Sequence, residues 1–172
     1  MGRFLNPGNE AFSEVIHSEI YVDKTPLLEY TNKVISTTSK FICSSRPRRF
    51  GKSITAEMLS AYYSKGCDSR ALFADYAICK ASSFEKHLNQ YDVIHFDVQW
   101  CMMDAGNADQ VVEYINNGIL QELKEKYGEL IPDTVKTAYG AMSYIKAAIG
   151  NKFIVIIDEW DVLIRDEAQN HK

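Results

Sequence analysis

Residues 41–53 read FICSSRPRRFGKS, an apolar run followed by a basic loop and then Gly-Lys-Ser. This order predicts a core strand over 41–44, a loop, and a helix over 52–64. It is typical of a phosphate-binding loop, in which backbone N–H groups at a helix N-terminus and one lysine hold the phosphates of a nucleotide. One position departs from the usual pattern, because Arg46 stands where a glycine is expected five residues before Gly51.

The departure at Arg46 changes what the loop can offer to a phosphate. An arginine does not readily take the positive φ angles that glycine permits. Pro47 also removes one backbone N–H that could face a phosphate. Arg48 and Arg49 add positive charge that can compensate for these losses. We therefore expect the loop to bind a triphosphate in an altered shape, or less tightly.

Two further apolar stretches predict strands. Residues 91–98 partly alternate between apolar and polar side chains, and residues 153–157 form an unbroken apolar run, FIVII. Such a run suits a strand covered on both faces of a parallel sheet. Helices are expected between the strands, over residues 11–19, 26–35, 83–90 and 108–127, and from Asp133 or Thr134 to Ile149. Strands that alternate with helices predict an α/β fold.

The last predicted strand ends in two adjacent carboxylates, and together with the loop they complete a nucleotide site. Lys52 would reach the β- and γ-phosphates, and Ser53 and Asp158 would hold Mg²⁺. Glu159 would act as general base toward the attacking water, so Glu159 and Lys52 are the predicted catalytic residues. The predicted nucleotide-binding residues are Arg48, Arg49, Phe50, Gly51, Lys52, Ser53 and Ile54.

Structural roles are favoured for several polar and aromatic residues near these strand ends. Asp161 is at least as well explained by the start of a helix as by catalysis. Asp97 ends the strand over 91–98, where a role in a turn is favoured. Trp100 and Trp160 are expected to pack against the core.

Composition restricts the class of protein. The hydrophobic fraction of 46% and the charged fraction of 24% over 172 residues are ordinary for one globular domain and exclude disordered and fibrous classes. The net charge of −4 gives no overall nucleic-acid signature, although residues 1–80 hold 11 Lys and Arg against 8 Asp and Glu. The four cysteines are far apart and there is no apolar leader, so we expect a reduced, cytoplasmic protein.

Three motifs together resemble a known family. They are YVDKT at 21–25, RPRRFGKS at 46–53 and IIDEWD at 156–161. The chain is similar to the AAA-ATPase-like family of bacterial proteins, in which RPRRFGKS is the family's own form of the Walker A motif. The resemblance covers essentially the whole chain.

The resemblance implies a three-layer P-loop NTPase fold with a mostly parallel sheet. It implies an N-terminal helical lead-in over 1–40 and the N-terminal part of an ATPase domain over 41–172. It also implies ATP and Mg²⁺ as ligands and a C-terminal nuclease-like domain, through which nucleic acid could be bound. Because the chain ends soon after the Walker B strand, we expect a truncated piece of a larger protein.

Alternative functions stay open at this stage. A P-loop scaffold could bind nucleic acid or an acidic partner through Arg48 and Arg49 without turnover. A small-molecule or nucleoside kinase also uses Gly-Lys-Ser, although the ending Asp158-Glu159 argues against it. The choice between adenine and guanine and the oligomeric state are not encoded in any visible motif.

Overall fold

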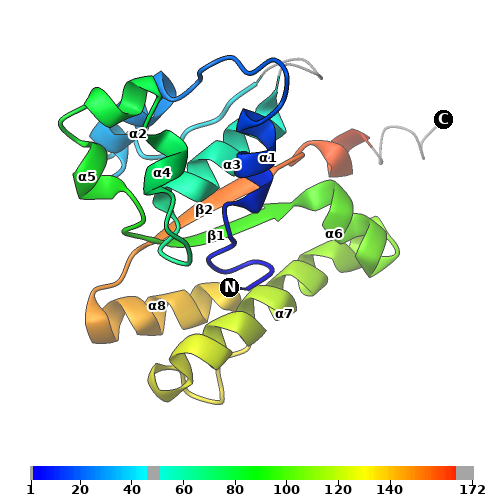
Figure 1. Cartoon of the computed structure of the whole chain (residues 1–172). Coiled ribbons are helices and arrows are strands. Elements are labelled where there is room, and N and C mark those ends of the chain that lie inside the picture. The colour runs from blue at the N-terminus through cyan, green and yellow to red at the C-terminus, as the bar shows by residue number, and fades with distance from the viewer. Residues whose placement is uncertain (1, 46–50, 166–172) are drawn as a thin grey trace. The chain divides into compact units, whose positions relative to one another are not determined.

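The computed structural model describes residues 2–45 and 51–165, and it divides into two compact units (Figure 1). Unit 1 contains Asn6–Tyr91, and unit 2 contains Gly2–Leu5 and Asp92–Lys172. The chain therefore passes from one unit to the other twice.

Unit 1 is helical, and aromatic side chains form much of its core. Its elements are α1 (Glu10–Ile16), α2 (Pro26–Val34), α3 (Lys52–Tyr63), α4 (Arg70–Phe73), the 3₁₀ helix η1 (Ala77–Lys80) and α5 (Phe84–His87). Phe12 stacks on Phe73 with 5.0 Å between ring centroids, and Tyr62 meets Phe73 edge-on at 5.4 Å. Such aromatic pairs stabilise a core beyond the area that they bury.

A buried hydrogen-bond network connects α3 to α2 and α5. Asn32 donates to the Tyr62 hydroxyl at 3.0 Å and accepts from the Tyr63 hydroxyl at 2.8 Å. The Tyr62 hydroxyl donates to the Phe84 carbonyl at 3.0 Å. Burial raises the pKa of Tyr62 to about 12, so this phenol stays neutral at physiological pH. The network thus fixes the C-terminal half of α3 with uncharged groups.

His87 should make the stability of unit 1 depend on pH. Its buried ring stacks on Tyr91, and Nδ1 lies 2.6 Å from the Tyr91 hydroxyl. Burial, helped by the charge of Lys86, lowers the pKa of His87. Because the unfolded chain then binds the proton more readily, stability is full above a pH of about 6.5 and is lost as the pH falls toward the folded pKa.

We expect His87→Gln to reduce the loss of unfolding free energy between pH 7.5 and pH 5, measured by urea denaturation. The exposed His17 offers a matched control, and His17→Gln should leave the loss as in the wild type. An identical pH dependence in His87→Gln and wild type would contradict the assignment.

Unit 2 holds the sheet and the longest helix. Its elements are β1 (Asp92–Asp97), α6 (Val98–Ala105), α7 (Ala108–Tyr127), the 3₁₀ helix η2 (Gly128–Leu130), α8 (Ala138–Ile149) and β2 (Phe153–Asp158). The strands β1 and β2 pair in parallel, from Asp92 opposite Phe153 to Asp97 opposite Asp158. The helices α7 and α8 run side by side and contribute Leu123 and Ile145 to the core (Figure 1).

The segment Gly2–Leu5 belongs to unit 2. Leu5 forms an antiparallel bridge with Ile94 of β1. The Glu122 carboxylate on α7 accepts hydrogen bonds from the backbone N–H groups of Arg3, Phe4 and Leu5. Three donors on one carboxylate give a charge-assisted anchor for this segment.

Asp92 is a fully buried carboxylate at the start of β1. It accepts hydrogen bonds from Lys126 at 2.8 Å, from the Tyr127 hydroxyl at 2.6 Å and from Asn151 at 2.6 Å. Lys126 and Tyr127 end α7, and Asn151 lies just before β2. One side chain therefore joins a helix end to the beginnings of both strands.

Removal of the Asp92 carboxylate should destabilise unit 2, because its three donors would lose their acceptor. We expect Asp92→Ala to lower the free energy of unfolding by about 3 kcal/mol, the cost of breaking a buried ion pair. Asp133→Ala removes an exposed carboxylate and should change it by less than about 0.5 kcal/mol. Urea denaturation of the two variants measures the difference, and equal effects would contradict this prediction.

Several expected elements are confirmed. The strands expected over 91–98 and 153–157 are β1 and β2, and the helix expected over 108–127 is α7 with those bounds. The helix expected before Ile149 begins later, at Ala138, because the Thr137 hydroxyl accepts the N–H of Gly140 and caps it there. The α/β class is therefore shown, with a parallel sheet that has two strands within residues 2–45 and 51–165.

Other expectations are wrong. Residues 41–45 form no strand, and Phe41 is 86% exposed, because no strand in the described part of the chain pairs with them. Helix α6 was not expected, and it begins where the Asp97 side chain accepts the N–H of Trp100 at 3.0 Å. Trp100 and Trp160 are not part of the core, since they are 64% and 49% exposed.

Candidate functional site

The phosphate-loop half of the predicted site lies in unit 1, where α3 begins at Lys52 as expected. Gly51 precedes it with φ 71° and ψ 39°, in the left-handed region that favours glycine. Lys52 and Ile54 are half-buried and Ser53 is exposed, all within the first turn of α3. The backbone N–H groups of this turn have no partner within the helix, which is the arrangement that attracts anions.

The carbonyl of Gly51 collects three donors. The Thr55 backbone N–H donates at 3.1 Å, the Thr55 hydroxyl at 3.0 Å, and the Lys24 ammonium at 3.2 Å. Sequence reasoning missed Thr55 and Lys24 as neighbours of the loop. Thr55 could have been found, because a threonine four residues on can donate back to a helical carbonyl. Lys24 is 27 residues away, and only the fold brings it there.

Three predicted nucleotide-binding residues, Arg48, Arg49 and Phe50, lie outside the described residues, as do Arg46 and Pro47. Their roles stay predictions.

The carboxylate half of the predicted site lies in unit 2, at the end of β2. Asp158 is 8% exposed, and its Oδ1 accepts the backbone N–H of Glu159 at 2.9 Å. Glu159 has φ 49°, an uncommon conformation for a residue with a side chain. Asp158 is therefore followed directly by a strained backbone position.

The Glu159 carboxylate is not isolated. Arg165 donates to Glu159 Oε2 at 2.6 Å, and its Nε lies 3.3 Å from Asp161 Oδ2. Both side chains of the Arg165–Glu159 pair are largely buried, at 28% and 20% exposed. Sequence reasoning missed Arg165, although its spacing of four residues from Asp161 is the spacing of a helical ion pair. Asp161 thus has the helix-start role that was considered for it.

Asp97 lies directly opposite Asp158 in the sheet, and it caps helix α6 instead of having the turn role that was expected. Its carboxylate caps α6, and this leaves Asp158 and Asp97 side by side at the carboxyl ends of parallel strands. His95 is two residues earlier on β1. Burial lowers the pKa of His95, although the charges of Asp158 and Asp97 oppose the shift.

The donor set fits Mg²⁺ only as a partial shell. Among residues 2–45 and 51–165, no group of three or more His, Cys, Asp or Glu side chains could hold a metal ion. Mg²⁺ is usually held by one or two carboxylates with phosphate oxygens and waters, so it does not require such a group. The Asp158 carboxylate and the exposed Ser53 hydroxyl are hard oxygen donors of the suitable kind. Ser53 belongs to unit 1 and Asp158 belongs to unit 2, so the binding of one shared ion by both residues is a proposal.

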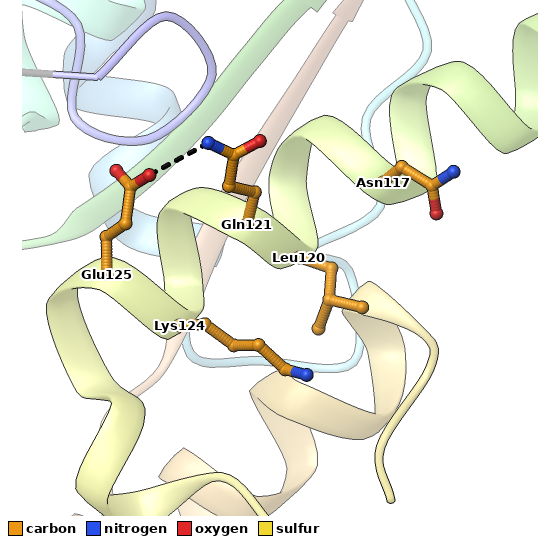
Figure 2. A pocket seen from close by; sticks show the side chains of 5 residues that line it. All are labelled: Asn117, Leu120, Gln121, Lys124 and Glu125. Carbon is orange, nitrogen blue, oxygen red and sulfur yellow. Dashed lines mark hydrogen bonds between the residues drawn. The ribbon is translucent and has the colours of Figure 1, made fainter. Parts of the chain in front are cut away.

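Unit 2 also has a shallow hollow, which is formed by other residues. Its lining side chains all project from α7, and Gln121 donates to Glu125 at 2.9 Å across it (Figure 2). Leu120 is the one apolar residue among its lining residues, and none of the predicted site residues takes part. We find no support for nucleotide binding there.

Comparison with known protein families identifies the class of this chain. The model of the AAA-ATPase-like family, described as predicted AAA-ATPase, matches residues 7–172. The chain therefore belongs to this AAA-ATPase-like family. Comparisons with curated proteins and with solved structures gave no match. None of the helices in the described residues is long and apolar enough to cross a membrane.

Proposed function

We propose that the chain binds ATP with Mg²⁺ and hydrolyses it, as part of a three-layer P-loop domain. The observation that carries the proposal is α3, which begins with Lys52 and Ser53 directly after a left-handed glycine. This is the local structure that a phosphate-binding helix start requires. Membership of the family supports the choice of ATP.

In this proposal each residue has one task. Lys52 places its ammonium against the β- and γ-phosphates, and the N–H groups of the first turn, from Gly51 to Ile54, bind phosphate oxygens. Ser53 and Asp158 hold Mg²⁺, which supplies neutralisation of phosphate charge when bound. Glu159 accepts a proton from water as the water oxygen attacks the γ-phosphorus and ADP leaves. Arg48, Arg49 and Phe50 complete the nucleotide contacts.

The alternative is a P-loop module that binds nucleotide without turnover. The ion pair between Glu159 and Arg165 favours it, because a carboxylate that accepts from a guanidinium is less available to accept a water proton. Contact of the arginine loop with nucleic acid or an acidic partner belongs to this alternative. The cytoplasmic location stays a prediction from the cysteines and the N-terminal sequence, and the nuclease-like domain stays a prediction from the resemblance.

The first test separates binding from hydrolysis. We expect Lys52→Ala to weaken ATP binding by about tenfold or more, since a charge-assisted contact to phosphate is lost. Glu159→Gln should keep ATP binding and lower phosphate release by about 100-fold, a typical contribution of a general base. Calorimetry and a phosphate-release assay measure the two effects.

Lys33→Ala is a matched control, because Lys33 is an exposed lysine of the same unit paired with Glu29. It should behave as the wild type. Unchanged ATP affinity in Lys52→Ala would refute the proposed function. ATP binding by the wild type without phosphate release would support the binding module.

The second test concerns the ion pair of Glu159. If Arg165 competes with water for the carboxylate, Arg165→Gln should raise kcat by about fivefold, the equivalent of one partly exposed ion pair. Asp161→Asn should lower kcat, because Arg165 would then interact with Glu159 alone. The ATP affinity should not change in either variant.

Arg70→Gln serves as the control, since it removes an exposed ion pair with Glu85. A lowered kcat in Arg165→Gln that Arg165→Lys restores would instead make Arg165 a residue that orients the base. Steady-state kinetics at saturating ATP distinguish the two cases.

A further inference from the structure

The segment YVDKT at 21–25 is held firmly in unit 1, although the proposed function gives it no task. Asp23 accepts the N–H of Thr25 at 2.8 Å and the N–H of Ala77 at 3.0 Å. The fully buried Thr25 hydroxyl accepts the N–H of Ile78 at 3.2 Å. Burial opposes ionisation of Asp23, yet these hydrogen bonds lower its pKa. The backbone on both sides of Lys24 is therefore fixed.

The fixed backbone directs Lys24 to the start of α3. Its half-buried ammonium donates to the Gly51 carbonyl at 3.2 Å. A Cβ atom built on Gly51 would lie 2.2 Å from Lys24 Nζ, so any other residue at this position would displace the ammonium. The positive φ favours glycine at position 51, and the absence of a side chain there leaves room for the Lys24 ammonium.

The contact with Gly51 places a second lysine at the residue that directly precedes α3. An ammonium has three donors and binds the charged oxygens of a phosphate more strongly than a carbonyl. Pro47 removes one backbone donor from the loop, and Arg46 does not readily take the positive φ that glycine permits. A cation from outside the loop can replace that lost interaction.

We infer that Lys24 is a second phosphate-binding lysine of the nucleotide site. Its ammonium contacts the triphosphate from the side of Gly51, together with Lys52. The inference rests on the proposed function, because it assumes that a nucleotide binds at the start of α3. It assigns the YVDKT segment the task of carrying this lysine.

The test compares Lys24→Met with Lys24→Arg in the whole chain. Affinity for ATP and for inorganic triphosphate is measured by calorimetry at low and high ionic strength. We expect Lys24→Met to weaken both ligands by about tenfold and to reduce the salt dependence of binding. Lys24→Arg should recover most of the affinity, because the charge and donors are kept. Lys33→Met, which removes an exposed lysine, should stay within about twofold of the wild type.

Each other result has a distinct meaning. Wild-type affinity in Lys24→Met, with affinity lost in Lys52→Met, overturns the inference and leaves the proposed function standing. Absence of ATP binding by the wild type refutes the proposed function itself. A loss for ATP without a loss for inorganic triphosphate overturns the inference, since Lys24 would then contact the nucleoside.

A purely structural role for Lys24 is also separable. The midpoint of thermal unfolding should fall only slightly in Lys24→Met, because the Gly51 carbonyl keeps its two donors from Thr55. A large fall of the midpoint together with affinity that Lys24→Arg does not restore would mean that Lys24 only clamps Gly51, and would overturn the inference.

Discussion

The buried carboxylate of Asp92 sets the register of the sheet in unit 2. It binds Asn151, two residues before β2, and Phe153 is the residue that pairs with Asp92. Each following residue of β1 pairs with the next residue of β2, and the last pair is Asp97 with Asp158. A slip by one residue would turn each side chain of β2 to the other face, so the buried Asp158 would be exposed. The position of the carboxylates at one end of the sheet thus depends on a polar contact at the other end.

The start of α3 depends on a different kind of constraint. A left-handed glycine leaves its carbonyl pointing along the helix, where the Thr55 N–H and hydroxyl bind it. Lys24 adds a charged donor to the same oxygen. The conformation of Gly51 is therefore fixed by groups on both sides, and the first N–H groups of α3 are already in place before any ligand arrives. Such preorganisation lowers the cost of binding an anion.

The sequence predicted those parts of the fold that local pattern determines. Helix α7 has a long apolar stripe with capping residues, and β2 has an uninterrupted β-branched run, so both were found. Helix α6 lacks such a stripe and begins at an Asp97 cap that also suits a turn. The apolar run over 41–44 predicted a strand, but a strand exists only with a partner, which local pattern cannot reveal. The same limit applies to the site. Tertiary structure brings Lys24 to Gly51, and local pattern cannot reveal such a contact. In contrast, the spacing of four residues between Asp161 and Arg165 is visible in the sequence.

The backbone of Glu159 links structure to the chemistry proposed for it. A left-handed conformation costs a residue with a side chain about 1 kcal/mol, so surrounding contacts must hold it. Two contacts do so, the Asp158 carboxylate on its N–H and Arg165 on its carboxylate. Loss of the Arg165 contact would remove part of the support for the strained backbone and release the carboxylate at the same moment. Strain and ion pairing are therefore coupled at one residue, and a ligand that attracted Arg165 or competed for it would change both together.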